Sequence, residues 1–386
     1  MSAPSVCRQL KSVHLLTAFG WLLIAVVGCS SDQPVAAPAA QTAASGEGVT
    51  ASPLPPGSSS TGQAQSGSAS AWKFTERTAA SGIVFAYRNG EEAGNFSILE
   101  SLGGGVAVLD LDADGVDDVC AAGGGSFDGR RILPLPTGLF RGIRDWKFRD
   151  VSEVAGISTT AFYSHGIART DFDLDGFSDV LVTGYGGLQL YRNCGDGTFE
   201  LQSDSCGLDD RQWSSSAAWG DLNSDGYPDL YAAHYVNWSW DNDPFCKGGP
   251  DNGREICPPR SYTGLTDVLY FSNGDGTFRN AATEFSLTAE GKGLGVLIAD
   301  FDLDNDNDIY VTNDTVSNFL YENDGRGRLT DASLASGSSL SSLGVPDGSM
   351  GVDACDYNAD GLPDIWVVNY ERETNAMYQN SGRMVF

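Results

Sequence analysis

The chain has few basic residues and very few histidines. Of its 386 residues, 23 are Lys or Arg, 51 are Asp or Glu and 3 are His, which gives a formal net charge of −28. No basic patch is visible, so the composition argues against nucleic acid as a partner. The histidines stand in no Ser/His/Asp, Cys/His or nucleophile-elbow pattern, and the sequence therefore predicts that the protein is not an enzyme.

Long apolar runs are also scarce. One run, Leu15 to Val27, follows the basic Arg8 and Lys11 and is short for a membrane-spanning helix. It ends at Cys29 in a sequence that resembles a bacterial lipobox. We therefore expect export to the bacterial cell envelope and a lipid anchor on Cys29; an ordinary secretory signal and an N-terminal membrane anchor are the alternatives.

Three segments follow from this composition. Residues 1–29 are the expected lipoprotein-type signal peptide. Residues 30–71 are rich in Ser, Ala, Pro, Gly and Gln and have almost no charge, which predicts a disordered tether. Residues 72–386 hold the strand-forming residues and are expected to form the folded part.

The cysteines show no C-x-x-C spacing, which argues against zinc. For an exported protein we predict two disulfides, Cys246–Cys257 within one loop and Cys194–Cys206 across one hairpin strand. Cys120 and Cys355 lie in expected strands and are predicted to be buried thiols.

The dominant feature of the chain is a nine-residue acidic phrase that occurs five times. The copies are DLDADGVDD (110–118), DFDLDGFSD (171–179), DLNSDGYPD (221–229), DFDLDNDND (300–308) and DYNADGLPD (356–364). Positions 1, 3, 5 and 9 carry oxygen ligands, and position 6 is Gly or Asn, which tolerate a left-handed backbone. This spacing predicts loops that bind a hard cation, above all calcium, about one per repeat.

The expected calcium ligands are Asp110, Asp112, Asp114, Asp118, Asp171, Asp173, Asp175, Asp179, Asp221, Asn223, Asp225, Asp229, Asp300, Asp302, Asp304, Asp308, Asp356, Asn358, Asp360 and Asp364. The loops are not EF-hands, because position 12 is Ala or Val in place of the bidentate Glu. They hold 20 of the 51 acidic residues, and five Ca²⁺ would reduce the formal charge to about −18.

The flanking sequence predicts the fold. Each loop lies between two apolar runs, and a small residue stands five positions before its first Asp: Gly105, Gly166, Ser216, Gly295 and Gly351. A hairpin signature follows each unit, as in LYRNCGDGTF (190–199) and LYFSNGDGTF (269–278). Four strands per unit, repeated about every 50–60 residues apart from one longer gap, predict an all-β protein, a β-propeller of four-stranded blades. A pair of β-sandwiches is the alternative.

The phrases D-x-D-x-D-G-x-x-D and L-Y-x-N-x-G-D-G-T-F resemble the FG-GAP or VCBS repeats of integrin-α-type propellers. Residues 81–115 and 256–278 resemble the cartilage acidic protein-like family, whose bacterial members usually carry a C-terminal ASPIC/UnbV domain. The resemblance covers about residues 72–386 and implies a propeller with bound calcium, and integrin-like propellers have seven blades. Such a domain is missing here, so we expect a truncated form of a longer protein; a closed five-bladed ring is the alternative.

The ends of the folded part give two further expectations. WKFTERTAASGI (72–83) matches WKFRDVSEVAGI (146–157), so the sequence enters the fold part-way through a repeat. Residues 377–386 are expected to complete the fifth hairpin, which would leave no vacancy for an N-terminal strand.

The most individual segment is an insert at residues 237–264. It carries aromatic and Arg side chains among Gly and Pro, which suit recognition of protein or sugar. The candidate ligand-binding residues are Trp238, Trp240, Arg254, Arg260 and Tyr262. The alternative is that these aromatics pack over a neighbouring blade.

Taken together, the sequence predicts a calcium-stabilised recognition or adhesion module at the cell surface, with an extracellular protein or polysaccharide as partner. His165 and His234 are expected to be structural. The competing hypotheses are a calcium-dependent polysaccharide lyase and an assembly module of a secreted complex.

Overall fold

A computed structural model describes residues 74–248, 253–281, 284–285 and 287–386, and Glu76–Phe386 form one compact unit. The expected signal peptide, lipidation site and tether lie outside the described residues. Within the described part, no helix is long and apolar enough to cross a membrane.

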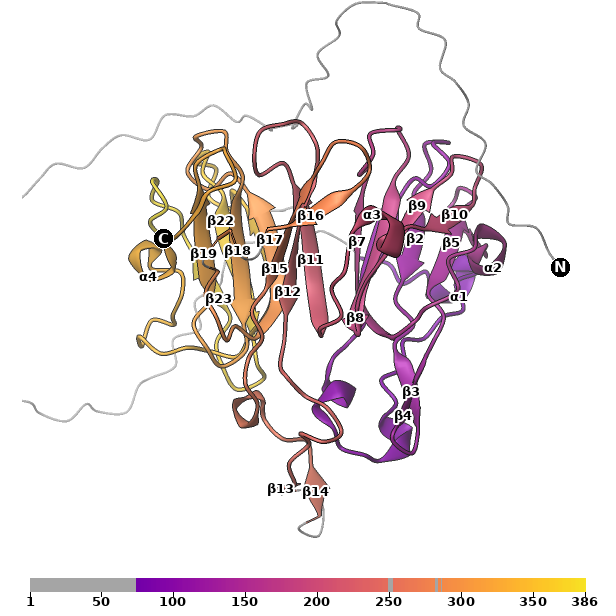
Figure 1. Ribbon diagram of the computed structural model, residues 1–386, viewed down its shortest axis with the longest axis horizontal. Coiled ribbons are helices and arrows are strands. Elements are labelled where there is room, and N and C mark those ends of the chain that lie inside the picture. The colour runs from indigo at the N-terminus through magenta and orange to yellow at the C-terminus, as the bar shows by residue number, and fades with distance from the viewer. Residues whose placement is uncertain (1–73, 249–252, 282–283, 286) are drawn as a thin grey trace, which may run out of the picture. The chain divides into compact units, whose positions relative to one another are not determined.

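The unit is a five-bladed β-propeller made of antiparallel sheets (Figure 1). The first blade contains β1 (Val106–Leu109), β2 (Asp118–Ala121), β5 (Gly138–Gly142) and β6 (Phe148–Asp150). The second contains β7 (Tyr163–Thr170), β8 (Asp179–Tyr185), β9 (Gly187–Asn193) and β10 (Phe199–Leu201). The third contains β11 (Ser214–Gly220), β12 (Asp229–His234), β15 (Val268–Ser272) and β16 (Phe278–Asn280). The fourth contains β17 (Gly293–Ala299), β18 (Asp308–Asn313), β19 (Phe319–Asn323) and β20 (Leu329–Asp331). The fifth contains β21 (Ser349–Cys355), β22 (Asp364–Asn369) and β23 (Ala376–Tyr378). The predicted order of strand, acidic loop, strand and hairpin is confirmed.

The fifth blade differs from the expectation. Its sheet has three strands, and residues 379–386 form a turn without a fourth strand. Phe386 stands where Phe199 and Phe278 begin the fourth strands of their blades. The expectation that residues 377–386 complete this hairpin is therefore wrong, because a hairpin signature contains the turn and only the first residue of the strand that follows it.

Short helices precede the first, second, third and fifth blades. They are α1 (Thr78–Ser81), α2 (Ser152–Ala155), α3 (Ser203–Cys206) and α4 (Ser333–Ser336). Each ends in a glycine with a left-handed backbone, and a Cβ on Gly82 or Gly156 would lie 2.7 or 3.1 Å from the carbonyl oxygen that begins the next blade's fourth strand. Since α1 and α2 are equivalent, the sequence does enter the fold at the connector that ends a repeat.

The core lies between the blades. Leu109, Cys120 and Leu139 of the first blade pack against Val180 and Val182 of the second, and similar clusters fill the next interfaces. The small residues identified in the sequence allow the inner strands to approach closely. A Cβ on Gly295 would lie 2.7 Å from the carbonyl oxygen of Met350, and one on Gly166 would lie 3.0 Å from that of Ser215.

The outer flanks of the first and last blades are exposed. Val106 and Val108, on the face of β1 opposite Leu109, are 63% and 50% exposed. Trp366 and Val368, on the face of β22 opposite Ile365, are 39% and 41% exposed. The first and fifth blades therefore do not bury each other as neighbouring blades do.

Two inserts extend from the same end of the blades (Figure 1). One is the hairpin β3 (Gly125–Asp128) and β4 (Arg131–Pro134), and the other contains β13 (Cys246–Lys247), β14 (Arg254–Glu255) and the 3₁₀ helix η4 (Pro259–Ser261). Two further 3₁₀ helices, η1 (Glu91–Ala93) and η2 (Ile98–Ser101), precede β1.

One of the two predicted disulfides is present. Cys246 and Cys257 are joined, with 5.3 Å between their Cα atoms. The Cys194–Cys206 disulfide is not formed, and that prediction is wrong. Cys194 directly follows β9. Cys206 ends α3, and α3 starts beside Leu190, which lies in β9 four residues before Cys194. These four residues span about 13 Å, which exceeds the reach of a disulfide.

Cys120 is buried as predicted. The prediction of a buried thiol is wrong for Cys355, which is exposed because β21 has no blade against its outer face.

Candidate functional site

Each acidic loop is folded by its own carboxylates. Asp110 accepts the N–H of Asp114 at 3.1 Å and that of Gly115 at 2.9 Å, and the first Asp of every other loop accepts the equivalent pair. Position 6 has a left-handed backbone in all five loops, as predicted. Position 4 also has a positive φ, which the sequence does not reveal, because Ala, Leu and Ser occupy it.

The Asp at position 9 joins its loop to the third strand of the blade. One oxygen of Asp118 accepts the N–H of Leu111 and the other accepts the N–H of Gly142, both at 2.7 Å. The other four blades repeat this arrangement. Burial raises the pKa of Asp179 to about 8 and those of Asp229 and Asp308 to about 7. A bound cation would favour their ionised forms.

The loops fit a calcium ion. One carboxylate oxygen from each member of three sets lies within 4.8 Å of the others; the sets are Asp110, Asp112 and Asp118; Asp171, Asp173 and Asp179; and Asp300, Asp302 and Asp304. In the first set, Oδ1 of Asp112 is buried and has no hydrogen-bond partner. The remaining two loops carry Asn at position 3, whose amide oxygen is also a calcium ligand. The donor sets therefore suit a hard cation such as calcium.

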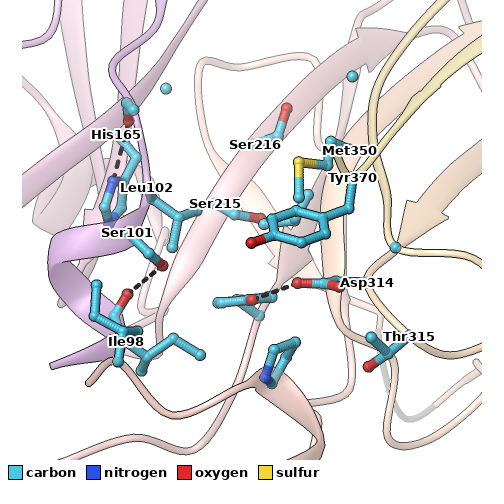
Figure 2. Close-up of a pocket in the computed structure, with 18 of the residues that line it drawn as sticks. Ile98, Ser101, Leu102, His165, Ser215, Ser216, Asp314, Thr315, Met350 and Tyr370 are labelled. Carbon is cyan, nitrogen blue, oxygen red and sulfur yellow. Dashed lines mark hydrogen bonds between the residues drawn. The ribbon is translucent and has the colours of Figure 1, made fainter. Parts of the chain in front are cut away.

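A cavity of about 720 Å³ lies at the other end of the blades (Figure 2). It is lined by four of the small residues that precede the acidic loops: Gly105, Gly166, Ser216 and Gly351. About 16 Å of inner strand separates these residues from the loops. The cavity therefore opens on the end of the molecule that carries the two inserts.

Polar and apolar groups meet in this cavity. Tyr235 donates a 2.6 Å hydrogen bond to Asp314, and Glu373 accepts the N–H of Gly348 at 2.6 Å. Burial and the charge of Glu373 raise the pKa of Asp314, although the Tyr235 hydrogen bond and Lys292 oppose this. Exposed Tyr370 and Arg260 also line the cavity. Ile98, Leu102, Leu294 and Met350 contribute the apolar surface.

The two described histidines are buried. His165 stacks on Trp213, and burial lowers its pKa to about 4, so it is neutral at physiological pH. His234 lies 3.3 Å from Asp210, and its ring nitrogen Nδ1 lies 2.6 Å from the carbonyl oxygen of Thr266. Both positions agree with the structural role expected from the sequence.

The structure separates the five ligand-binding candidates of the insert. Trp238 and Tyr262 are buried in a cluster with Ile98, Trp213 and Tyr235, and Trp240 packs on Trp238 and Phe127. Arg254 forms an ion pair with Asp243. Of the five, Arg260 alone lines the cavity. The aromatic residues thus cover the end of the propeller, which is the alternative weighed for them.

Sequence reasoning missed Asp314, Tyr370 and Glu373. All three follow the second strand of their blade at the end opposite the acidic loop. The repeat pattern offered a signal for them, because the connections that follow the second strand of each blade lie at the same end of the propeller as the insert.

Comparison with known proteins identifies the repeats. Residues 171–232, 261–311 and 300–367 match the family model of the FG-GAP-like repeat. The match does not test the resemblance to ASPIC/UnbV proteins. No curated protein sequence matches the chain.

Solved structures resemble the chain only distantly. A lectin from Agrocybe aegerita, described as recognising non-reducing terminal N-acetylglucosamine, is 14% identical with a TM-score of 0.35, over 74% of this chain and 79% of the lectin. The biofilm matrix protein Bap1 of V. cholerae is 13% identical with a TM-score of 0.36, over 69% of this chain and 34% of Bap1.

Proposed function

Because the chain carries FG-GAP-like repeats folded as a five-bladed β-propeller, we propose that it is a calcium-binding recognition or adhesion module. It binds an extracellular protein or a polysaccharide and catalyses no reaction. Its expected signal peptide and Cys29 would place it on the bacterial cell envelope, held by a lipid anchor.

The cavity at the insert-bearing end carries this proposal. It offers hydroxyl groups, two carboxylates, an arginine and an aliphatic floor within one concave surface. Such a mixture orients a ligand through its polar groups while the apolar part is removed from water. The disulfide-linked insert forms one wall of the cavity, which is lined by its residues 256–260.

Calcium has a structural role in this proposal. The loop carboxylates of one blade repel one another, and a bound ion would offset this repulsion at the turn between the two inner strands. The cavity lies at the far end of those strands. Calcium would therefore preserve the shape of the cavity without contacting the ligand.

The test is binding of the full chain, in calcium, to an array of bacterial polysaccharides and to envelope and host-surface proteins. We expect Tyr370→Ala to weaken binding of the identified ligand at least tenfold, because Tyr370 is half exposed at the cavity. Tyr357→Ala is the matched control, since Tyr357 is equally exposed but lies in the acidic loop at the opposite end. Equal binding by the two variants would exclude the cavity as the ligand site.

A further inference from the structure

One position at the end of the third strand of each blade has the same register relative to the acidic loop; in the fifth blade it directly follows β23. It immediately precedes the residue whose N–H donates to the Asp at position 9, at 2.7–3.0 Å in the five blades. This register makes the five positions equivalent. Their residues, in order of the blades, are Arg141, Arg192, Phe271, Glu322 and Gln379.

In the first two blades this position holds a counterion. Arg141 forms ion pairs with Asp112 and Asp114, the latter at 3.1 Å. Arg192 forms ion pairs with Asp173 and Asp175, the latter at 2.5 Å. All of these acids are expected calcium ligands at positions 3 and 5.

In the fourth blade the same position holds another acid. Glu322 immediately precedes Asn323, whose N–H donates to Asp308 at 3.0 Å, so its carboxylate adds to the five Asp side chains of loop 300–308. Within the described part of the chain, no ion pair links a lysine or arginine to the carboxylates of loop 300–308. This loop therefore has the highest density of unbalanced negative charge among the five.

We propose that the five calcium loops differ in affinity, and that the third-strand residue sets the order. Arg141 and Arg192 weaken calcium binding in the first two blades, because their positive charge lies beside the ligands of a divalent cation. Glu322 strengthens binding in the fourth blade, which therefore fills first. This inference rests on the calcium binding proposed above.

The arginines also substitute in part for the ion. When calcium is removed, Arg141 and Arg192 still neutralise the carboxylates of their loops, whereas none of the ion pairs among the described residues reaches loop 300–308. The fourth blade is therefore the part of the propeller that depends most on calcium. These loops are exposed to solvent, and a unit charge about 6 Å from a divalent ion changes its affinity by about tenfold at the dielectric constant of bulk water.

The test is calorimetric titration of calcium into the metal-free full chain and its variants. Glu322→Gln is expected to weaken the tightest site about tenfold and to leave the weaker sites unchanged. Arg192→Gln is expected to tighten one weak site about tenfold and to lower the melting temperature of the metal-free protein. An unchanged or lower calcium affinity in Arg192→Gln would overturn the proposal.

The controls change the same charge at the opposite end of the blades. Arg130→Gln and Glu371→Gln alter exposed residues beyond β3 and β22, far from the loops, and should leave every calcium affinity unchanged. If the unmodified chain binds no calcium, the proposed calcium function fails. If it binds calcium with the same affinities in all variants, only the present inference fails.

Discussion

Single amide side chains hold neighbouring blades together. Asn193, Asn323 and Asn380 stand directly after the third-strand position that shares a register with the acidic loop, and each donates from Nδ2 to the backbone carbonyl of position 2 in the preceding blade's loop at 2.7–2.8 Å. The same residues give their backbone N–H to the Asp at position 9. One residue thereby ties two acidic loops to one hairpin.

Replacement of Asn323 should measure this link. Its amide also donates to the carbonyl of Asn307 at 2.9 Å. Asn323 is buried, so Asn323→Ala removes this donor from the carbonyls of both Leu222 and Asn307. We expect a loss of about 3 kcal/mol in the free energy of unfolding, measured with urea in saturating calcium. Asn273→Ala, which removes one hydrogen bond to Thr277 in an exposed turn, should cost less than about 1 kcal/mol. Similar losses in the two variants would contradict the link.

His165 should make the protein less stable in acid. Its pKa is about 4 in the folded protein and about 6.5 in the unfolded chain, so the unfolded chain binds the proton more readily between these values. The contribution of neutral His165 to the free energy of unfolding is fully present above pH 6.5. It falls by about 3 kcal/mol as the pH drops towards 4. The side chain faces Tyr87, packs at a tilt against Tyr163 and stacks on Trp213.

The measurement compares urea unfolding of the unmodified protein and His165→Gln at pH 7 and pH 4.5. Gln keeps an amide donor for the carbonyl of Gly103, which His165 approaches at 3.4 Å. We expect the variant to lose about 2–3 kcal/mol less than the unmodified protein over this interval. Parallel losses would show that His165 does not titrate in this way.

Among the elements, those fixed by local spacing could be predicted from the sequence and those fixed by long-range packing could not. The acidic loops were predictable because their ligands and turn residue lie within nine positions. The strands beside them were predictable because blades bury both faces, which requires continuous apolar runs such as VLVTG after Asp179. The hairpin β3–β4 lacks such a run, since β4 is only partly buried, and it was not predicted.

The candidate site divides in the same way. The Cys246–Cys257 disulfide and the carboxylate clusters of the acidic loops followed from spacing alone. The cavity did not, because Tyr235, Asp314 and Glu373 come from different blades and meet only when the inner strands are arranged about a common channel. The insert aromatics were recognised as unusual, but their burial against Trp213 depends on the same arrangement.

For the whole molecule, the exposed flanks make the geometry of the acidic loops important for stability. In a propeller each blade is stabilised by its two neighbours, and here the first and fifth blades each have one outer face in water. The loss of loop geometry in one blade is therefore poorly compensated by packing at these ends.

Removal of calcium should lower the melting temperature of the full chain substantially. Without an ion, the loop carboxylates repel one another and the turns between inner strands lose their fixed geometry, so the folded state loses the free energy of metal binding. The measurement is a thermal melt followed by circular dichroism, in about 2 mM calcium or in excess EDTA. Calcium added back beyond the chelator should restore the higher value, whereas magnesium should restore little of it, because loops of this kind supply more oxygen ligands than magnesium accepts. Identical melts with and without EDTA would show that the five loops stabilise the propeller through their hydrogen bonds and arginines alone.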